Sequence, residues 1–235
     1  SHRGWTAITA SGGELSDGNY YLADNVKLTN NITINGTVTL CLNGYTLTGM
    51  GSGSVITANI DQTFTLCDCS RHGAGKITGG NAMKGGTIEG NTASEDGGGV
   101  RVYIGTFIME GGVISGNTAD SGGGVYVGGG ATFTMKGGTI GGNTANSGGG
   151  VYVGAGGTFN MYGGVITENS ANYGGGVYVK SGTFNMDGGT IKSNTSSGGY
   201  GTLSFGGSGV YVEARGNFSM NNTAGGTENK IGYGS

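Results

Sequence analysis

The stretch TFTMKGGTIGGNTANSGGGVYV, residues 132–153, decides the fold because it recurs along the chain. The motif Thr-Phe-x-Met begins at residues 106, 132, 158 and 183, at intervals of 26, 26 and 25 residues. Each copy continues through Gly-Gly-x-Ile and an Asn into a glycine cluster and a Val-x-Val segment. Short β-type segments separated by glycine corners predict that each repeat forms one turn of a parallel β-helix.

The composition excludes several classes of protein. Of the 235 residues, 58 are Gly and none is Pro, and Gly does not fall at every third position, so a collagen triple helix is excluded. The glycines recur with a period, which favours a folded repeat over a disordered chain. The net charge is -3 and basic residues are scattered, so we expect no nucleic-acid partner. We expect no membrane insertion either, because no stretch approaches the roughly 18 apolar residues of a span.

We therefore predict an all-β fold, a single-stranded parallel β-helix with about 26 residues per coil. Neighbouring coils would pair in register roughly 4.8 Å apart, with glycines supplying the positive φ angles of the corners. We expect a single domain over residues 1–235, with residues 1–30 as an N-terminal cap, residues 31–220 as coils and residues 221–235 as a C-terminal cap. Capped ends predict a monomer.

The alternation of side chains within each segment predicts the core. The Phe and Met of Thr-Phe-x-Met and both valines of Val-x-Val are expected to point inward. A column of Asn follows the recurrent Ile, and we expect its side-chain amides to hydrogen-bond from coil to coil. The residues of this column are Asn91, Asn117, Asn143, Asn169 and Asn194. An outward column alternates in charge, as ladders do to avoid like charges side by side. Its residues are Glu110, Lys136, Tyr162 and Asp187.

The blocks GGGVYV, TFTMKGGTI, GGNTA, VTLCLNGYTLTG and FTLCDC carry a resemblance to known proteins. They resemble the right-handed β-helix repeats of surface proteins from gut-dwelling Gram-positive bacteria, over residues 31–220. The glycine-rich units are also similar, more loosely, to repeats of chlamydial polymorphic outer-membrane proteins and autotransporter passengers. The resemblance implies a right-handed, pectate-lyase-like β-helix that is extracellular or attached to the cell wall. This architecture hosts both enzymes and adhesins, so it does not choose an activity.

The middle residues of the Val-x-Val segments form the first candidate site. They are expected to point outward, and they read Arg101, Tyr126, Tyr152, Tyr178 and Tyr211. Tyrosines at the coil spacing present a flat amphipathic stripe, whose hydroxyls and rings suit a glycan or another ligand on a host or cell surface. Stacked tyrosines also stabilise a ladder with no ligand at all, and that structural interpretation stays open.

Residues for catalysis are few. Sugar hydrolysis usually needs two carboxylates about 5–9.5 Å apart, and the best grouping is Asp96, beside Glu95, with Asp120 one coil later. A solvated corner with a surface ion pair to Arg101 explains the same residues. His2 and His72 lie in the N-terminal tail and a loop, with no triad or metal spacing around them. We predict no cofactor and no metal site.

The three cysteines are expected to be structural. Cys41 and Cys67 are 26 residues apart, which stacks them in successive coils, either as a disulfide or as a pair of buried thiols. Cys67-Asp68-Cys69 lacks the second Cys or His pair of a zinc site.

Three functional hypotheses follow. The favoured one is a non-catalytic, extracellular module for adhesion or glycan binding through the tyrosine column. The second is a pectate-lyase-like enzyme, a polysaccharide lyase or glycoside hydrolase that uses Asp96 or Asp120. The third is a structural stalk without a ligand, or an ice-binding solenoid that uses its Thr columns, such as Thr37/Thr39 and Thr132/Thr134.

Overall fold

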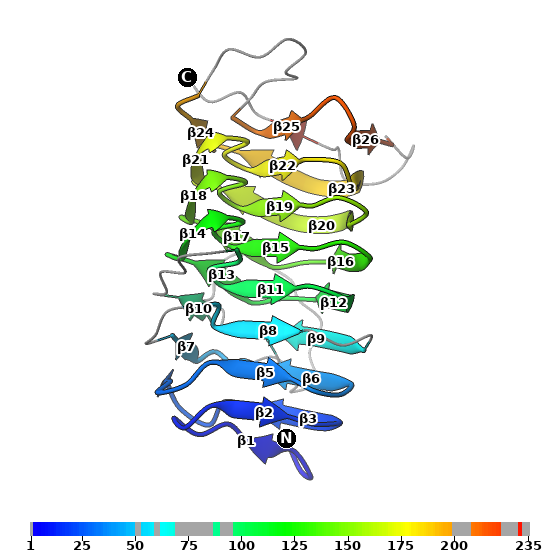
Figure 1. The fold of residues 1–235 in the computed structure, drawn as a ribbon. Helices are drawn as coiled ribbons and strands as arrows, with labels where there is room; N and C mark the ends of the chain where they lie inside the picture. Colours follow the sequence, from blue (N-terminus) through cyan, green and yellow to red (C-terminus); the bar gives the residue numbers. More distant parts are fainter. Residues whose placement is uncertain are drawn as a thin grey trace, which may run out of the picture.

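The computed structural model describes residues 2–49, 53–58, 62–68, 87–89, 96–198, 208–221 and 230–231. These residues form strands that wind into a column of stacked coils, with the N-terminus at one end and the C-terminus towards the other (Figure 1). Neighbouring coils pair in parallel, with identical motif positions opposite each other. The predicted all-β parallel β-helix is confirmed. Within the described part of the chain, no helix is long and apolar enough to cross a membrane.

The largest sheet, sheet A, has fifteen strands and follows two successive segments of each coil. In β20 (Thr158–Thr167) and β23 (Thr183–Lys192) both segments form one continuous strand. The first segment carries the Phe of the repeat in the regular coils. Its other strands are β1 (Thr6–Ala7), β3 (Gly18–Tyr21), β6 (Val38–Cys41), β9 (Thr63–Cys67), β12 (Gly105–Met109), β16 (Ala131–Met135) and β26 (Asn217–Met220). The other strands of the second segment are β4 (Val26–Lys27), β7 (Thr46–Thr48), β10 (Thr87–Glu89), β13 (Val113–Ser115), β17 (Thr139–Gly141) and β27 (Lys230–Ile231).

Two smaller sheets complete the coils. Sheet B has eight strands and contains the Val-x-Val segments, and sheet C has four strands between the Asn column and the glycine cluster. Sheet B consists of β2 (Gly13–Leu15), β5 (Ile32–Ile34), β8 (Ile56–Ala58), β11 (Val100–Val102), β15 (Val125–Val127), β19 (Val151–Val153), β22 (Val177–Val179) and β25 (Val210–Val212). Sheet C consists of β14 (Thr118–Ser121), β18 (Thr144–Ser147), β21 (Ser170–Tyr173) and β24 (Thr195–Ser196).

The N-terminal segment already takes part in the stacking. Strands β2, β3 and β4 pair with β5, β6 and β7, so the stacked strands begin before residue 31, where the coils were expected to start. The repeat motif is missing from this segment, but backbone pairing requires only extended strands in register. Strand β27 pairs with β23 near the other end, and residues 222–229 and 232–235 lie outside the described residues.

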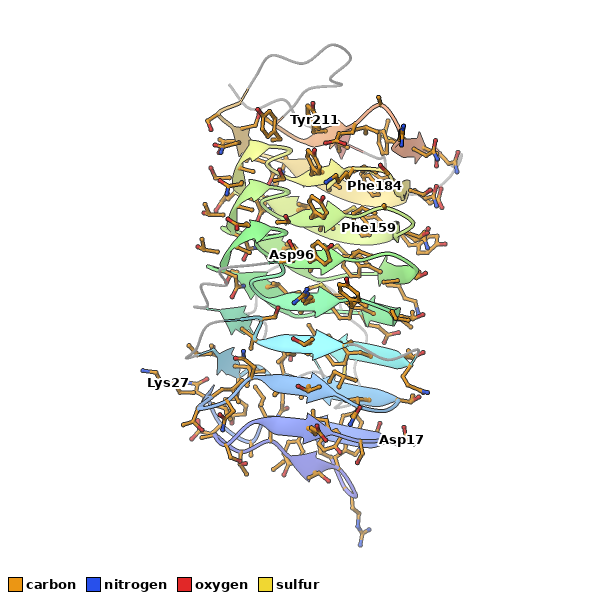
Figure 2. The ribbon with its side chains drawn as sticks, viewed as in Figure 1. Asp17, Lys27, Asp96, Phe159, Phe184 and Tyr211 are labelled. Atoms are coloured by element: carbon orange, nitrogen blue, oxygen red, sulfur yellow. The ribbon has the colours of Figure 1, made fainter. Side chains whose placement is uncertain are left out.

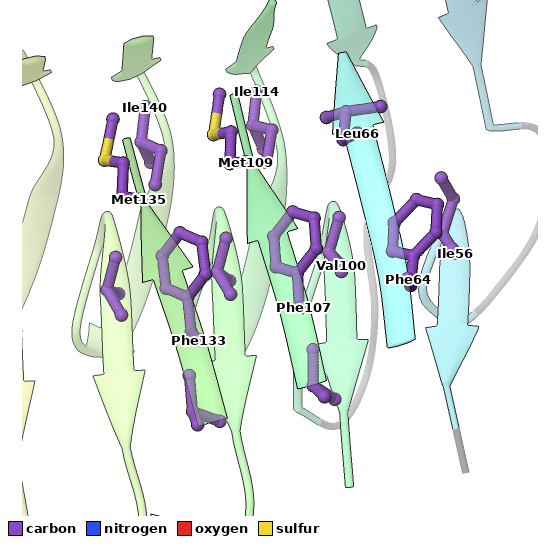
Figure 3. Close-up of a cluster of buried hydrophobic side chains, with 14 of the residues drawn as sticks. Ile56, Phe64, Leu66, Val100, Phe107, Met109, Ile114, Phe133, Met135 and Ile140 are labelled. Carbon is purple, nitrogen blue, oxygen red and sulfur yellow. The ribbon is translucent and has the colours of Figure 1, made fainter. Parts of the chain in front are cut away.

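The core is built from columns of identical side chains, as predicted. The Phe, Met, Ile and Val positions of the regular coils are fully buried. Phe64, Phe107 and Phe133 stack upon one another, and the Met and Ile positions pack beside them (Figure 3). One contiguous cluster of this kind runs along the described coils, so each coil is stabilised chiefly by its neighbours.

The Asn column is a buried ladder, also as predicted. Asn143 donates from its amide nitrogen to Asn169 Oδ1 (3.0 Å) and to the carbonyl of Ile114 (2.9 Å). Its own Oδ1 accepts from the backbone and side-chain nitrogens of Asn117. Asn117, Asn143, Asn169 and Asn194 have no exposed surface, and Asn91 lies outside the described residues. The adjacent glycine cluster makes room for the ladder, because a Cβ at Gly150 would lie 3.0 Å from Asn169 Nδ2.

Candidate functional site

Sheet B positions the candidate residues at the centres of five successive strands. Arg101 pairs in register with Tyr126, and the pairing continues through Tyr152 and Tyr178 to Tyr211. The valines on either side of each are turned into the core in β11, β15, β19 and β22. The alternation within each strand therefore directs the middle side chain to the outer face, as expected.

The four tyrosines Tyr126, Tyr152, Tyr178 and Tyr211 form a continuous pile, which we call the tyrosine stack. Successive ring centroids are 5.2 Å apart, and the angles between ring planes are 8°, 13° and 1°. The ring faces are therefore turned towards one another. Tyr152 and Tyr178 retain only 7% of their surface, so the stripe offers ring edges and hydroxyls to a ligand rather than open faces.

Two corner columns border the tyrosine stack. The corner before each strand carries Asp96, Ser121, Ser147 and Tyr173. The corner after each strand carries Tyr103, Gly128, Gly154, Lys180 and Glu213, whose backbone nitrogens donate to the preceding coil. The tyrosine rings extend beside this second corner, where a Cβ at Gly154 would lie 3.6 Å from the Tyr126 hydroxyl and 3.7 Å from the Tyr152 ring.

An exposed aromatic ring stands at each end of the stack. At the N-terminal end the Arg101 guanidinium carbon lies 5.3 Å from the ring centroid of Tyr103 and 6.0 Å from that of Tyr126. At the other end the ring of Tyr173 is tilted by 55° against Tyr211, with 5.7 Å between centroids. Tyr103 is 49% exposed and Tyr173 is 44% exposed, so both present ring surface to solvent.

Carboxylates also stand at the two ends of the stack. The Tyr178 hydroxyl donates a hydrogen bond to Glu213 Oε1. Asp96 lies beside Tyr126 near the opposite end, and Figure 2 labels Asp96 and Tyr211. Burial, and then the charge of Asp96, raises the pKa of Tyr126. Burial, and then the hydrogen bond to Glu213, raises the pKa of Tyr178.

Tyr152 sits between these ends, and its pKa is raised to about 12 by burial first and then by Tyr126, Asp96 and Glu213. Because the shifts all favour the protonated form, the phenols remain O–H donors at neutral pH. The stripe thus presents a row of phenol hydroxyls, of which Tyr178 already donates its O–H to Glu213, with one carboxylate near each end.

Asp96 and Asp120, the expected catalytic candidates, do not occupy equivalent positions. Asp96 forms a bridge with Ser121, so Asp120 is one position out of step with it. Asp120 lies on the outer face of sheet C, where it accepts a hydrogen bond from Asn146 (2.9 Å). Successive residues of a strand point to opposite faces, which directs Asp96 towards the tyrosine stack and Asp120 away from it.

The remaining candidates for chemistry lie elsewhere. His2 stacks on Tyr21, with 4.7 Å between ring centroids, and meets Trp5 edge-on at 5.1 Å. Among the described residues, no group of three or more His, Cys, Asp or Glu is placed to hold a metal ion. Glu95, His72 and Cys69 lie outside the described residues.

The cysteines correct one expectation. Cys41 and Cys67 are opposite each other in β6 and β9, as predicted. Cys41 is disulfide-bonded, whereas Cys67 is a thiol whose pKa is raised to about 11, by burial and then by the charges of Glu110 and Asp68. Both alternatives are therefore wrong, because the stacked pair is neither a disulfide nor two thiols. Side chains that leave parallel strands in register lie side by side, which is a poor arrangement for the torsion of a disulfide.

Sequence reasoning missed the residues around the stack. Tyr103 and Glu213 directly follow a Val-x-Val segment, and Tyr173 directly precedes a glycine cluster. Aligning the corners in the same way as the strands would have revealed them. The reason to do so is physical, since a corner residue of one coil lies against the side chains of the next.

Comparison with protein-family models, curated proteins and solved structures finds no match to this chain.

Proposed function

We propose that this protein is a non-catalytic, extracellular module that binds a glycan along the tyrosine stack. The observation that carries the proposal is the pair of half-exposed rings, Tyr103 and Tyr173, at the two ends of a row of phenol hydroxyls. The rings lie three coils apart, which corresponds to about 14 Å along the axis. Because Tyr103 follows its strand of sheet B and Tyr173 precedes its own, a short oligosaccharide that contacts both rings would cross the tyrosine stack obliquely.

The chemistry along the row supports a sugar ligand. A pyranose has an apolar C–H face and a rim of hydroxyls, and it needs both an aromatic surface and hydrogen-bonding partners. The exposed rings supply the surface, and the protonated phenols supply donors. The guanidinium of Arg101 adds hydrogen-bond donors at one end of the tyrosine stack, and the carboxylates of Asp96 and Glu213 add acceptors.

The disulfide at Cys41 supports the extracellular part of the proposal. Disulfides persist in oxidising compartments and are rare in the cytosol. The position on a cell wall or cell surface follows from the resemblance of the repeats.

The orientation of the acids supports a binding role over catalysis. A glycosidase needs two carboxylates that face one substrate, and Asp96 and Asp120 belong to different faces of the coil. An enzyme of the lyase or hydrolase class remains the alternative, and it predicts depolymerisation of a polysaccharide, with or without Ca²⁺, that Asp96→Asn or Asp120→Asn abolishes.

A structural stalk is the second candidate, and the burial of Tyr152 and Tyr178 favours it. Rings that are 7% exposed and stacked on both sides stabilise the coils whether or not a ligand binds. On this view the tyrosine stack is an external ladder, and the solenoid serves as a spacer.

A glycan array tests both candidates. Wild-type protein is expected to give a signal that falls about tenfold or more in the double variant Tyr103→Ala/Tyr173→Ala, which removes the exposed rings and keeps the stack. The matched control is Asn146→Ala/Asn172→Ala, which alters two exposed residues on sheet C. A wild-type signal that the ring variant leaves unchanged would refute binding at the stack. No wild-type signal on any glycan would favour the stalk.

A further inference from the structure

Tyr162 differs from every other outward ring in the regular coils. It lies on β20, on the outer face of sheet A, and it is 54% exposed, the largest value among the exposed large apolar residues of the described chain. In the tyrosine stack of sheet B each ring meets another ring, whereas the motif positions that correspond to Tyr162 in the adjacent coils carry Lys136 and Asp187. The ring therefore stands alone among polar residues.

The two neighbours of Tyr162 in this column are paired away from it. Lys136 Nζ lies 3.2 Å from Glu110 Oε1, one coil further towards the N-terminus. Asp187 Oδ1 accepts a hydrogen bond of 2.8 Å from Asn221, on the opposite side. Both polar groups thus have partners other than Tyr162, whose side chain is 54% exposed.

The register of the strand adds to this opening. Opposite Tyr162 on β23 lies Gly188, at a local irregularity between otherwise regular pairs. A Cβ at Gly188 would collide with the backbone of Tyr162, so this position has no side chain to cover the ring. Tyr162 therefore faces a glycine on β23 rather than another side chain.

Two residues before Tyr162 on β20, Asn160 belongs to a row of polar side chains that hydrogen-bond from coil to coil. Ser219 donates to Asn185 Oδ1 (2.7 Å), and Asn185 donates to Asn160 Oδ1 (2.9 Å). Each side chain of this row donates to the one in the preceding coil. Within the described residues, the amide nitrogen of Asn160 is therefore the last donor of the row. Asn160 and Tyr162 point to the same face, roughly 6–7 Å apart along the strand.

We propose that Tyr162 and Asn160 form a second, separate subsite on sheet A that binds one neutral pyranose residue. The C–H face of the sugar packs on the open ring, and the amide nitrogen of Asn160 donates to one of its hydroxyls. An isolated ring within polar ladders suits a sugar better than a protein partner, because protein interfaces bury a contiguous patch of about 800 Å² per partner around several apolar anchors. The subsite does not depend on the tyrosine stack, which lies on sheet B.

Saturation-transfer NMR with methyl glycosides tests the subsite. The probes are the methyl β-glycosides of glucose, galactose and N-acetylglucosamine, each at millimolar concentration. At least one is expected to receive saturation on the C–H protons of one ring face. In the background of Tyr103→Ala/Tyr173→Ala, which removes the exposed rings beside the tyrosine stack, Tyr162→Ala is expected to abolish this signal and Tyr162→Phe to keep it, while Asn160→Ala weakens binding about two- to tenfold.

The controls separate this subsite from the tyrosine stack. Tyr103→Ala/Tyr173→Ala by itself should retain a methyl glycoside signal, and the urea midpoint of Tyr162→Ala should equal that of the wild type because the ring is exposed. Transfer that survives when Tyr162→Ala is added to Tyr103→Ala/Tyr173→Ala, or that is already absent in Tyr103→Ala/Tyr173→Ala, overturns the proposal. Absence of transfer to all three glycosides in the wild type overturns it as well.

Discussion

Two aromatic piles run along this solenoid, one inside it and one outside. The inner pile consists of Phe64, Phe107, Phe133, Phe159, Phe184 and Phe218 in sheet A, with ring centroids 4.6–5.2 Å apart. The outer pile is the tyrosine stack of sheet B, with 5.2 Å between centroids. The rings are nearly parallel in both, although one pile is enclosed by core and the other is bordered by corners and carboxylates.

Stacking by itself says nothing about function. A parallel β-helix places identical residues opposite each other at the strand spacing, so any repeated aromatic residue forms a pile. The surroundings separate the two piles. The phenylalanines from Phe64 to Phe184 are fully buried among Val, Met and Ile, whereas the tyrosines hydrogen-bond Glu213 and lie beside Asp96 and Arg101.

The largest effect is expected from the inner pile. Phe133→Ala should lower the free energy of unfolding by about 3–5 kcal/mol, because it opens a cavity between two stacked rings in a fully buried site. Urea denaturation measures this, and Phe133→Leu, which keeps most of the volume, is the matched control and should cost less. If Tyr152→Ala cost as much as Phe133→Ala, the distinction between the inner and outer piles would fail.

The buried Asn column is a polar counterpart of the inner aromatic pile. Asn143→Ala should cost about 3 kcal/mol, because it leaves the backbone nitrogen of Asn117 and the carbonyl of Ile114 without their partner in a site that water does not reach. Asn146→Ala, in the same coil on the exposed face of sheet C, should change the urea midpoint little. Equal effects of the two variants would show that the inner ladder gives no more stability than the outer one.

Within the outer pile the expected effect is smaller. Tyr152→Ala removes two stacking contacts and should cost about 1–3 kcal/mol, since each aromatic pair contributes roughly 0.5–1.5 kcal/mol beyond its buried area. Tyr152→Phe keeps both contacts and should be close to neutral. The same urea experiment decides this, and a neutral Tyr152→Ala would mean that the stack contributes nothing to the fold.

A last effect is a dependence of stability on pH, to which the outer pile and the Cys67 thiol contribute. The pKa of Tyr152 is about 12 in the folded protein and 10.0 ordinarily, so between these values the folded state binds more protons than the unfolded state. The contribution of Tyr152 to stability should be fully present below pH 10 and fall as the pH rises towards 12, whereas that of Cys67, whose pKa is raised from 9.0 to about 11, should fall between pH 9 and 11. Tyr126 and Tyr178 act in the same direction, because their pKa values are raised too.

Urea midpoints measured across this pH range give the slope, and phenolate absorbance follows the titration directly. Tyr152→Phe should make the fall shallower, whereas Tyr162→Phe, on sheet A, is the control for loss of a phenol outside the stack. A wild-type protein whose stability rises through this range would contradict the assignment of raised pKa values to the stack.

The sequence predicted the regular coils well because three periodicities agree there. The interval of 26 residues fixes which residues stack, the alternation in Val-x-Val fixes which side chains are buried, and the glycine cluster fixes the corner. Gly148 illustrates the last point. Its φ is +67°, and a Cβ there would lie 2.5 Å from the carbonyl oxygen of Val151.

The candidate site was predicted only in part. The alternation placed Tyr126 and Tyr152 on the outer face, but it contains no information about the neighbouring rings that bury their faces. Nor did it place Asp96 and Asp120 on different faces, since one residue of offset at a corner reverses the direction of a side chain. The sequence also allowed a disulfide at Cys41 but paired it with Cys67, because equal spacing places these two residues opposite each other without showing that their side chains can form the bond.

The repeated pattern of apolar, glycine and amide positions was enough to predict the architecture. Such a chain buries its apolar residues and pairs its backbone by stacking its coils. The exposure of each outward side chain, in contrast, depends on the tertiary structure. Tyr152 and Tyr162 are the same residue type, both on outward strand positions, yet one is 7% and the other 54% exposed. The difference comes from the adjacent coils, which supply parallel rings to Tyr152 and side chains that pair away from Tyr162.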